Sequence, residues 1–382
     1  MKKLKQARQL IIATYSTLQM SGGGIESWLQ KILIYREKLL KTYSDISIIG
    51  QTSNSETIAD VFHVNHVRFI FYNKNSLISG IFNYIKCVRS IAKNYKQINM
   101  DIIFVGALYP SLPILFISKK IRTFIWLRSF FEYEINELSI KKIRPLAMLL
   151  EKNCLYRANK IIANGEDTKI LYEQKYKKLK DIVVIPNAID TKVVKSNQLT
   201  LRNDVVKIAY VGRFYKNKGI EEFLDSIKII NKEKTDKRFV FLFVGFGEYE
   251  DKVKSLEKTY SNVKLIGRVN NTQIFDFLST IDCTVNLTFS RKDTGGSGVS
   301  NSLLESIFAN NLPIAWKNFC YEQILNDNNA VLITEGNSSE LSQAYDAIYE
   351  NRNIYLNKIN KLIALKDNYC FSKHIEKLLE VL

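Results

Sequence analysis

Three glycines, three serines and one asparagine precede an apolar stretch in TGGSGVSNSLLESIF, residues 294–308. Glycines let backbone N–H groups approach a ligand closely, and a helix that begins near Ser300 adds unpaired amides and the positive end of a helix dipole. Such a turn can bind phosphate or sugar hydroxyls, and Glu305, one to two turns into the helix, can accept hydrogen bonds from a ribose diol. Alternatively, Ser302 and Glu305 form a capping box, which is a purely structural motif.

A second candidate site lies in YVGRFYKNKGIEEFL, residues 210–224. A predicted strand ends at Gly212, two cations follow at Arg213 and Lys218, and a helix then begins. Cations in this position of an α/β sheet can hold a diphosphate and neutralise its charge as it leaves. The alternative interpretation is a pair of solvated surface cations.

Several other catalytic signatures are missing from the sequence. The glycines of SGGGIESWL, residues 21–29, lack the G-x-G-x-x-G spacing and the following acid of a dinucleotide site, and neither a P-loop nor a D-x-D metal motif occurs. His63, His66 and His374 form no recognisable metal-binding or triad pattern. The five cysteines are odd in number and lack paired spacing, which argues against a disulfide framework or a zinc site and fits a reducing cytoplasm.

Strands and helices that alternate along the chain are needed to position these residues. In the first half we predict strands at 9–16, 45–50, 101–108, 122–129, 160–164 and 181–187, and helices at 28–40, 86–96 and 141–160. In the second half we predict strands at 207–213, 238–247, 263–269, 282–288 and 312–316, and helices at 220–231, 250–259, 271–280, from near Ser300 and at 368–382. Such alternation indicates an α/β protein with parallel sheets.

With 382 residues, the chain is too long for one ordinary domain. The polar segment 190–204 is the predicted linker. We therefore place one Rossmann-like domain at 1–195, joined by the returning helix 368–382, and a second at 196–367. Two open α/β sheets in tandem predict a ligand-binding cleft between the carboxyl ends of both sheets.

Charge is divided unevenly between the two halves. Residues 1–200 contain 31 Lys and Arg against 15 Asp and Glu, whereas residues 201–382 contain 24 against 23. The basic half is either a solvated, lysine-rich surface or a surface that meets lipid headgroups, a polyprenyl phosphate or nucleic acid. Nucleic acid is disfavoured because no RNA- or DNA-binding motif with interleaved aromatic residues occurs. The basic start MKKLKQARQLIIATYS predicts a strand rather than a signal peptide, and no apolar run approaches the length of a membrane span.

Together these stretches resemble the retaining family 4 glycosyltransferases of GT-B fold, a group that includes bacterial capsule, O-antigen and mannolipid sugar transferases. The resemblance covers nearly the whole chain and is strongest over residues 183–316. VIPNAID (184–190) is similar to the family's V-I-P-N-G-[IV]-D, FVGFGEYEDKV (243–253) to V-G-x-G-x-x-x-x-x-[LV], and GVSNSLLESIFANNLPI (298–314) to E-G-x-S-N-S-L-L-E-A-M-A-x-G-x-P-V. The terminal FSKHIEKLLEVL resembles the helix that crosses back to the first domain of this fold.

The resemblance implies a site for a nucleotide diphosphate sugar. Arg213 and Lys218, which hold the diphosphate, and Glu305, which holds the ribose, are the expected catalytic residues. The other implied donor-binding residues are Gly212, Gly245, Arg268, Val269, Asp293, Ser297, Gly298, Val299, Ser300 and Asn301. The loop of Gly22, Gly23 and Gly24 and the side chain of Arg128 are expected on the acceptor side. No metal or other cofactor is expected.

Two positions depart from the family's pattern. Its E-x7-E motif ends at Glu305, so the first glutamate, which usually faces the transferred sugar, is replaced by Ser297; Asp293 nearby can substitute for it. Many members have a histidine where Arg128 stands, and some branches have an arginine. A catalytic histidine is therefore not expected here.

The implied activity is that of a metal-independent, retaining glycosyltransferase of the hexosyltransferase type. It would move a sugar from a nucleotide diphosphate sugar to a glycan or a polyprenyl-diphosphate-linked glycan in bacterial capsule or O-antigen synthesis. We expect a cytoplasmic location, with peripheral contact between the basic N-terminal domain and an anionic membrane. Two alternatives stay open: a nucleotide-sugar epimerase of the same fold, for which no converging acid–base set is seen, and a catalytically degenerate nucleotide-sugar-binding partner subunit.

Overall fold

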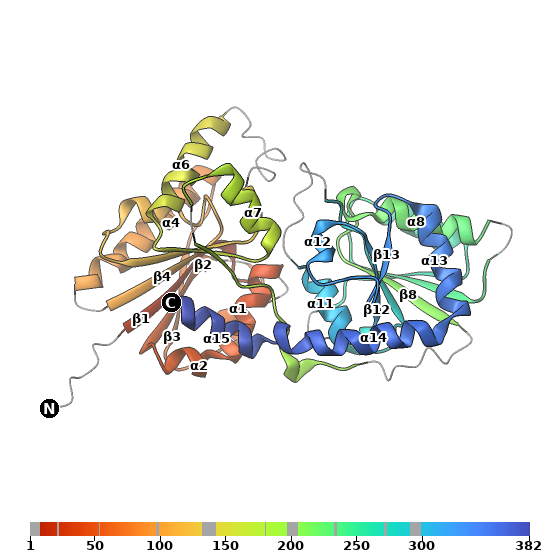
Figure 1. Cartoon of the computed structure of the whole chain (residues 1–382). Coiled ribbons are helices and arrows are strands. Elements are labelled where there is room, and N and C mark those ends of the chain that lie inside the picture. The colour runs from red at the N-terminus through yellow and green to blue at the C-terminus, as the bar shows by residue number, and fades with distance from the viewer. Residues whose placement is uncertain are drawn as a thin grey trace. The chain divides into compact units, whose positions relative to one another are not determined.

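The computed structural model of the chain describes residues 8–20, 23–52, 54–96, 99–131, 143–179, 181–196, 205–232, 235–270, 273–290 and 299–382. The chain divides into two compact units, each with its own sheet (Figure 1). The first unit comprises Met1–Pro186 and Ser372–Leu382, and the second comprises Asn187–Phe371. Both divisions lie close to the boundaries we placed at 195/196 and 367/368.

The first unit is built on a seven-stranded parallel sheet with the order β3-β2-β1-β4-β5-β6-β7. Its strands are β1 (Arg8–Thr17), β2 (Asp45–Gln51), β3 (Val67–Tyr72), β4 (Asn99–Val105), β5 (Arg122–Leu127), β6 (Lys160–Ala163) and β7 (Ile182–Val184). In β1, which lies between β2 and β4, Ile11 pairs with Ser47 of β2 and with Ile102 of β4. The centre of β1 is apolar on both faces and fully buried, as expected for a strand with helices on each side.

Helices cover the sheet of the first unit. They are α1 (Gly24–Ile34), α2 (Arg36–Leu40), α3 (Ile58–Val61), α4 (Leu77–Ala92), α6 (Arg144–Arg157) and α7 (Glu166–Lys175), with 3-10 turns η1 (Lys93–Lys96) and η2 (Leu112–Phe116). Ser76 caps α4 by accepting a hydrogen bond from the amide of Ser79, and a proline stands at the start of α6. The single helix predicted at 28–40 is interrupted at Tyr35, whose ψ of 12° ends α1.

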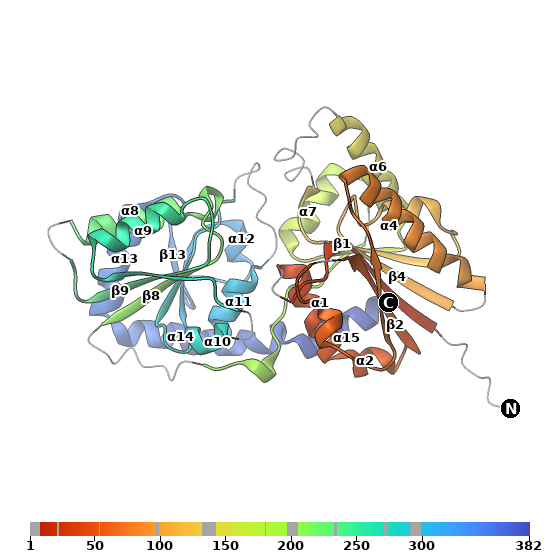
Figure 2. The ribbon, with the colours of Figure 1, turned by 180° about the vertical axis from the view of Figure 1, so that it is seen from behind.

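The terminal helix α15 (Phe371–Val381) returns to the first unit, as the resemblance implied. Figures 1 and 2 show it beside α1 and α2 from both sides. The indole N–H of Trp28 donates to Nε2 of His374 at 2.9 Å, and Lys38 forms an ion pair with Glu376 at 2.6 Å. A buried hydrogen bond and a surface ion pair therefore attach the end of the chain to its beginning.

The second unit has a six-stranded parallel sheet with the order β10-β9-β8-β11-β12-β13. Its strands are β8 (Val206–Val211), β9 (Phe239–Val244), β10 (Val263–Gly267), β11 (Cys283–Asn286), β12 (Leu312–Trp316) and β13 (Val331–Ile333). Within this sheet, the path of the chain starts at β8, runs outward through β9 to β10, and then returns to β11 on the other side of β8. Connections at the carboxyl ends of β8 and β11 therefore diverge, which creates the topological switch point where open α/β sheets bind ligands.

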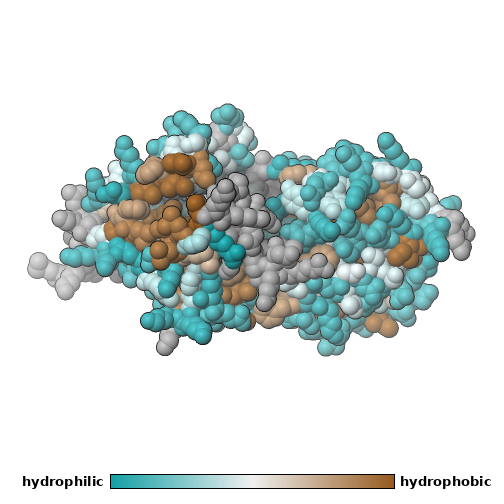
Figure 3. All heavy atoms as spheres, turned by 90° about the horizontal axis from the view of Figure 1, so that it is seen from above, coloured by the Kyte–Doolittle hydropathy of each residue, from teal (hydrophilic) through white to brown (hydrophobic). Residues whose placement is uncertain are grey.

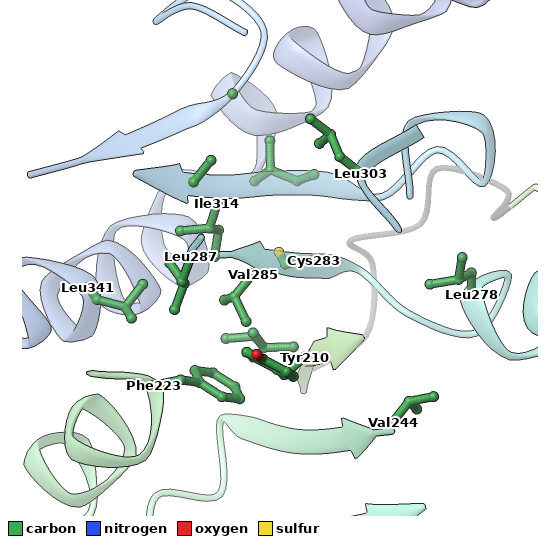
Figure 4. Close-up of a cluster of buried hydrophobic side chains, with 14 of the residues drawn as sticks. Tyr210, Phe223, Val244, Leu278, Cys283, Val285, Leu287, Leu303, Ile314 and Leu341 are labelled. Atoms are coloured by element: carbon green, nitrogen blue, oxygen red, sulfur yellow. The ribbon is translucent and has the colours of Figure 1, made fainter. Parts of the chain in front are cut away.

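The helices of the second unit pack on both faces of this sheet. They are α8 (Ile220–Ile230), α9 (Glu250–Thr259), α10 (Ile274–Leu278), α11 (Asn301–Phe308), α12 (Phe319–Glu322), α13 (Ser338–Glu350) and α14 (Arg352–Lys366), with 3-10 turns η4 (Thr191–Val193), η5 (Lys216–Lys218) and η6 (Asp367–Tyr369). Figure 4 shows part of the core, where Tyr210 of β8 and Val285 of β11 lie near Phe223 of α8. All three side chains are buried, so the segments that carry the candidate site rest on one packed core.

The predicted fold class is confirmed, but two edge strands were not predicted. In β3 the sequence VRFIFY has no buried residue except the last, and β13 is only three residues long. Both strands have a weaker buried pattern than the central strands β8 and β9, although the edge strands β7 and β10 were predicted.

A search of the described residues finds no helix with the length and apolar character needed to cross a membrane.

Candidate active site

The loops after β8 and β11 are joined at the switch point of the second unit. The side-chain nitrogen of Lys218 lies 3.3 Å from Oγ1 of Thr288, and the amide of Phe289 donates to the carbonyl oxygen of Asn217 at 3.1 Å. Lys218 ends the turn η5 before α8, whereas Thr288 follows β11. The cation is thus held between the two loops that diverge at the carboxyl edge of the sheet.

A buried tyrosine shapes the turn that carries the two predicted cations. The hydroxyl of Tyr210 lies 3.0 Å from the carbonyl oxygen of Arg213 and 3.1 Å from that of Lys218. The ring of Tyr210 is 3% exposed, so it anchors both ends of the turn to the core. The guanidinium of Arg213 is exposed and lies over the ring of Tyr215, 5.4 Å from its centre.

The electrostatics of Lys218 differ from those of a solvated lysine. Burial of its side chain, and then repulsion by Arg213, lower its pKa below the usual range. Both effects disfavour the positive charge in the absence of an anion. An anionic group placed between Lys218 and Arg213 would relieve them, which favours an anion-binding site over the alternative of two solvated cations.

Glycines allow the loops after β8, β9 and β10 to approach one another. At Gly245, φ is +137° and an added Cβ would lie 1.8 Å from the carbonyl oxygen of Gly212. The amide of Gly212 donates to Val244 at 2.9 Å, and the amide of Gly245 donates to Gly267 at 2.8 Å. The three carboxyl ends therefore form a layer of closely packed backbone where no side chain fits at Gly245.

Arg268 and Val269, which are among the predicted donor-binding residues, follow β10 at the same edge of the sheet. The guanidinium of Arg268 lies over the exposed ring of Phe246, 5.3 Å from its centre. Val269 is partly buried against the core. Sequence reasoning did not single out Phe246, which lies between Gly245 and Gly247 in the glycine loop after β9.

The helix predicted near Ser300 begins there. Ser300 is the N-cap of α11, and its hydroxyl accepts a hydrogen bond from the amide of Leu303 at 3.2 Å. The capping-box alternative for Ser302 and Glu305 is therefore wrong, because Ser302 is already the second residue of the helix. Asn301 is the first, and Glu305 is half-buried one turn further on. Since α11 follows β11 and precedes β12 in a parallel sheet, its amino end lies at the carboxyl edge of the strands.

The predicted donor-binding residues next to α11 are only partly described. Asp293, Ser297 and Gly298 lie outside the described residues. The side chain of Val299 is buried in the core, and its carbonyl oxygen accepts a hydrogen bond from the side-chain amide of Asn187 at 2.8 Å. The backbone of Val299, and not its side chain, is therefore the part that could contact a ligand.

The sequence analysis missed three polar residues at the carboxyl edge, which are Ser290, Asn318 and Glu335. Glu335, after β13, accepts hydrogen bonds from Nδ2 of Asn318 at 2.6 Å and from the amide and hydroxyl of Ser290 at 3.0 and 2.9 Å. Asn318, after β12, also donates to the carbonyl oxygen of Thr288 at 3.1 Å. This network positions the loop after β11. The signal for Glu335 was lost because β13 itself was not predicted.

The residues expected on the acceptor side belong to the first unit. Gly23 is the N-cap of α1 and Gly24 is its first residue, while Gly22 lies outside the described residues. Arg128 follows β5, and its guanidinium lies 4.4 Å from the centre of the Trp126 ring. Burial lowers the pKa of Arg128 to about 10, whereas the charge of Glu26 raises it.

Glu26 is a further acidic residue of this region that sequence reasoning missed. Its carboxyl group is largely buried in the first turn of α1, and burial raises its pKa, while hydrogen bonds from its own amide and that of Gly23 lower it. Within the described part of the chain, His, Cys, Asp and Glu side chains form no cluster of three or more that could hold a metal ion.

Comparisons with known proteins find related sequences over most of the chain. Two family models match the chain: Glycosyltransferase Family 4 over residues 39–193 and Glycosyl transferases group 1 over residues 206–351. An uncharacterized glycosyltransferase of Methanocaldococcus jannaschii is 24% identical over 328 residues and is matched over 79% of both chains.

Solved structures with the same arrangement of strands and helices are also found. Sucrose-phosphate synthase from Thermosynechococcus elongatus superposes with a TM-score of 0.75 at 12% identity, over 98% of both chains. HepE of Anabaena in complex with UDP-glucose superposes with a TM-score of 0.71 at 14% identity, also over 98% of both chains. At these identities the likeness concerns the fold.

Proposed function

The chain belongs to the family 4 glycosyltransferases of GT-B fold, and we propose that it transfers a sugar from a nucleotide diphosphate sugar to a glycan or lipid-linked glycan. The observation that carries this proposal is the position of Lys218. It is a partly buried cation beside Arg213, with a lowered pKa, at the switch point of the second unit. A diphosphate bound at this point would place a negative charge beside the positive charges of both side chains.

The proposed reaction breaks the bond between the anomeric carbon and the diphosphate oxygen. Negative charge then develops on the leaving diphosphate, where Arg213, Lys218 and the amides at the start of α11 would stabilise it. Glu305 would accept hydrogen bonds from the ribose. Since these cations supply the positive charge, we propose that no metal ion is required.

We further propose that the anomeric configuration is retained by attack of the acceptor from the side of the leaving group. This route needs no protein nucleophile. We expect Gly23 and Arg128 of the first unit to contact the acceptor. A polyprenyl-diphosphate-linked glycan of a bacterial surface polysaccharide, such as capsule or O-antigen, would match the basic character of that unit.

A thermal-shift screen of the full chain against UDP, GDP, ADP and their sugars tests the donor site. UDP is the first nucleotide to test, because similar structures of HepE contain UDP or UDP-glucose. A ligand at a hundred times its Kd stabilises the native state by about 2.7 kcal/mol. If no nucleoside diphosphate raises the melting temperature, the proposal is wrong.

Turnover separates the proposed enzyme from its two alternatives. A transferase releases the nucleoside diphosphate only when an acceptor is present, and NMR of the product shows whether the anomeric configuration is retained. An epimerase would convert the sugar without an acceptor. A catalytically degenerate partner would show the thermal shift but no turnover with any acceptor tried.

A further inference from the structure

One face of the first unit exposes an unusual number of large apolar side chains. Figure 3 shows it from above as a broad hydrophobic area on the side of the unit where α4 and α6 lie. Ile78 and Phe82 of α4 are each 68% exposed, Phe116 of η2 is 51% exposed, and Leu146 and Leu149 of α6 are each 54% exposed. We call this the α4–α6 surface; its remaining exposed apolar members are Leu77, Ile143 and Tyr156.

The turn η2 connects the two helices into one surface. The hydroxyl of Tyr84 in α4 donates to the carbonyl oxygen of Pro110 at 2.7 Å. Arg157 of α6 donates to the carbonyl oxygens of Ile114 and Ile117 at 2.9 and 2.6 Å. Because both helices are bonded to the same short segment, their exposed apolar side chains lie on adjoining parts of one face.

The exposed side of α4 changes from apolar to cationic along its length. Ile78 and Phe82 are followed at helical spacing by Lys86, Arg89 and Lys93, all of which are exposed. The opposite side of the helix carries buried residues, including Tyr84 and Val88. The outer face of α4 therefore combines exposed apolar and basic residues, whereas its inner face packs on the core.

The charges of the α4–α6 surface have one sign. Residues 73–96 and 110–122 contain no Asp or Glu. In residues 143–160 the single acid is Glu151, which is fully buried and pairs with Lys175 at 2.8 Å. Exposed cations of these segments are Lys74, Lys86, Arg89, Lys93, Lys119, Lys120, Arg122, Lys152 and Lys160. The acids of segment 132–142 lie outside the described residues.

From these observations we propose that the α4–α6 surface docks on an anionic lipid bilayer. Apolar side chains enter the boundary between headgroups and acyl chains, while the surrounding lysines and arginines bind anionic headgroups. A second copy of the chain fits less well, because a twofold interface would place this cationic surface against itself. The proposal assigns the membrane contact expected from the sequence to one surface of the first unit, and it does not depend on nucleotide binding by the second.

Vesicle co-sedimentation of the full chain tests the docking surface. The vesicles are phosphatidylcholine alone, or phosphatidylcholine with phosphatidylglycerol, at low salt. We expect binding to the mixed vesicles and little binding to the neutral ones. Two variants, Ile78→Ser with Phe82→Ser, and Lys86→Gln with Arg89→Gln and Lys93→Gln, should each weaken binding by roughly tenfold or more.

Matched variants in the second unit serve as controls. Ile354→Ser with Ile363→Ser removes exposed apolar side chains of α14, and Lys258→Gln with Lys264→Gln and Lys361→Gln removes the same charge as the cationic triple variant. These should bind mixed vesicles as the unchanged chain does. Because all the altered side chains are exposed, thermal melting is expected to stay close to that of the unchanged chain.

Three outcomes would overturn the proposal. In the first, the chain does not sediment with mixed vesicles. In the second, the control variants lose as much binding as the α4–α6 variants, which would indicate a general effect of charge. In the third, vesicle binding is absent and sedimentation velocity shows a dimer that dissociates in the variant Ile78→Ser with Phe82→Ser. The nucleotide thermal shift of each variant, measured in parallel, keeps a failure of docking distinct from a failure of the proposed sugar transfer.

Discussion

The side-chain nitrogen of Lys218 lies 3.3 Å from the hydroxyl oxygen of Thr288, which joins the loops that follow the neighbouring strands β8 and β11. The chain runs in opposite directions across the sheet after these two strands, so their loops diverge there. Among the described cations of the turn after β8, Lys218 is partly buried, whereas Arg213 and Lys216 are exposed.

Lys218→Ala should weaken the binding of a nucleoside diphosphate by about 2 kcal/mol, or roughly thirtyfold in Kd, because one charge-assisted hydrogen bond is lost. Isothermal titration calorimetry measures this. Lys216→Ala is the matched control, since Lys216 is exposed on the same turn and pairs with Glu221 instead. Equal losses in both variants would contradict the proposed role of Lys218.

The affinity for the diphosphate should also depend on pH. Burial and Arg213 lower the pKa of Lys218, so the cation that binds the ligand is present at low pH and is lost as pH rises through that lowered value. The decline should therefore begin at a lower pH than for an ordinary lysine. Lys218→Arg keeps its charge throughout, and its affinity should lack this decline; a decline unchanged in the arginine variant would assign it to another group.

Gly245→Ala should destabilise the second unit by about 3 kcal/mol or more, because its Cβ would collide with the carbonyl oxygen of Gly212 at a φ of +137°. Gly267→Ala is the comparison: φ is +78° there, but no atom lies within 4 Å of the added Cβ, so only about 1–2 kcal/mol of backbone strain is expected. Calorimetric unfolding measures both. Similar losses of unfolding free energy in the two variants would mean that the loops of Gly212 and Gly245 do not approach one another closely.

Ser300→Ala should cost about 1 kcal/mol through loss of the N-cap of α11. Ser302→Ala should cost clearly less, because the hydroxyl of Ser302 lies 3.2 Å from the hydroxyl of Ser300 and does not cap the helix. Denaturant unfolding of the two variants compares them directly. A larger effect at Ser302 would favour the capping box that the structure excludes.

His374 should make the first unit sensitive to acid. Nδ1–H donates to the carbonyl oxygen of Pro186 at 2.8 Å and Nε2 accepts from Trp28, so the ring is neutral. Burial lowers its pKa to about 3, whereas the unfolded chain takes up a proton near 6.5. Below pH 6.5 the unfolded state binds the proton and the folded state does not, so stability falls by about 2 kcal/mol between pH 6.5 and 5.

Unfolding of His374→Gln at several pH values checks this expectation. Glutamine can donate to Pro186 and accept from Trp28 but does not titrate, so the acid-dependent loss should shrink by the same 2 kcal/mol. His63→Gln is the control, because His63 is exposed. If the slope is unchanged in His374→Gln, another group is responsible for it.

Removal of divalent metal ions should leave sugar transfer unchanged, since Arg213 and Lys218 supply the positive charge at the diphosphate. Turnover in the presence of EDTA, with and without added Mg²⁺ or Mn²⁺, measures this. A strong loss that Mg²⁺ or Mn²⁺ restores would show that the proposed site is incomplete.

Much of the fold and part of the site follow from the sequence by itself. The apolar runs of the central strands, the glycines after β8 and β9 and the serine that begins α11 are local signals, because each depends on the backbone or buried face of a few consecutive residues. They identified the two sheets, the carboxyl edge of the second one and the residues along it. The edge strands β3 and β13 escaped because little of their surface is buried.

Only the tertiary structure decided which of these residues act together. The sequence does not distinguish the roles of Lys216 and Lys218. In the structure, Lys218 and not Lys216 contacts Thr288, which follows β11 much later in the chain. Asn318 and Glu335 lie at the same edge, after the strands β12 and β13. Likewise, the sequence shows a basic first half, whereas packing of η2 between α4 and α6 joins its exposed apolar and basic side chains into one surface. Burial and charge at a point depend on contacts between distant segments, which local sequence patterns do not contain.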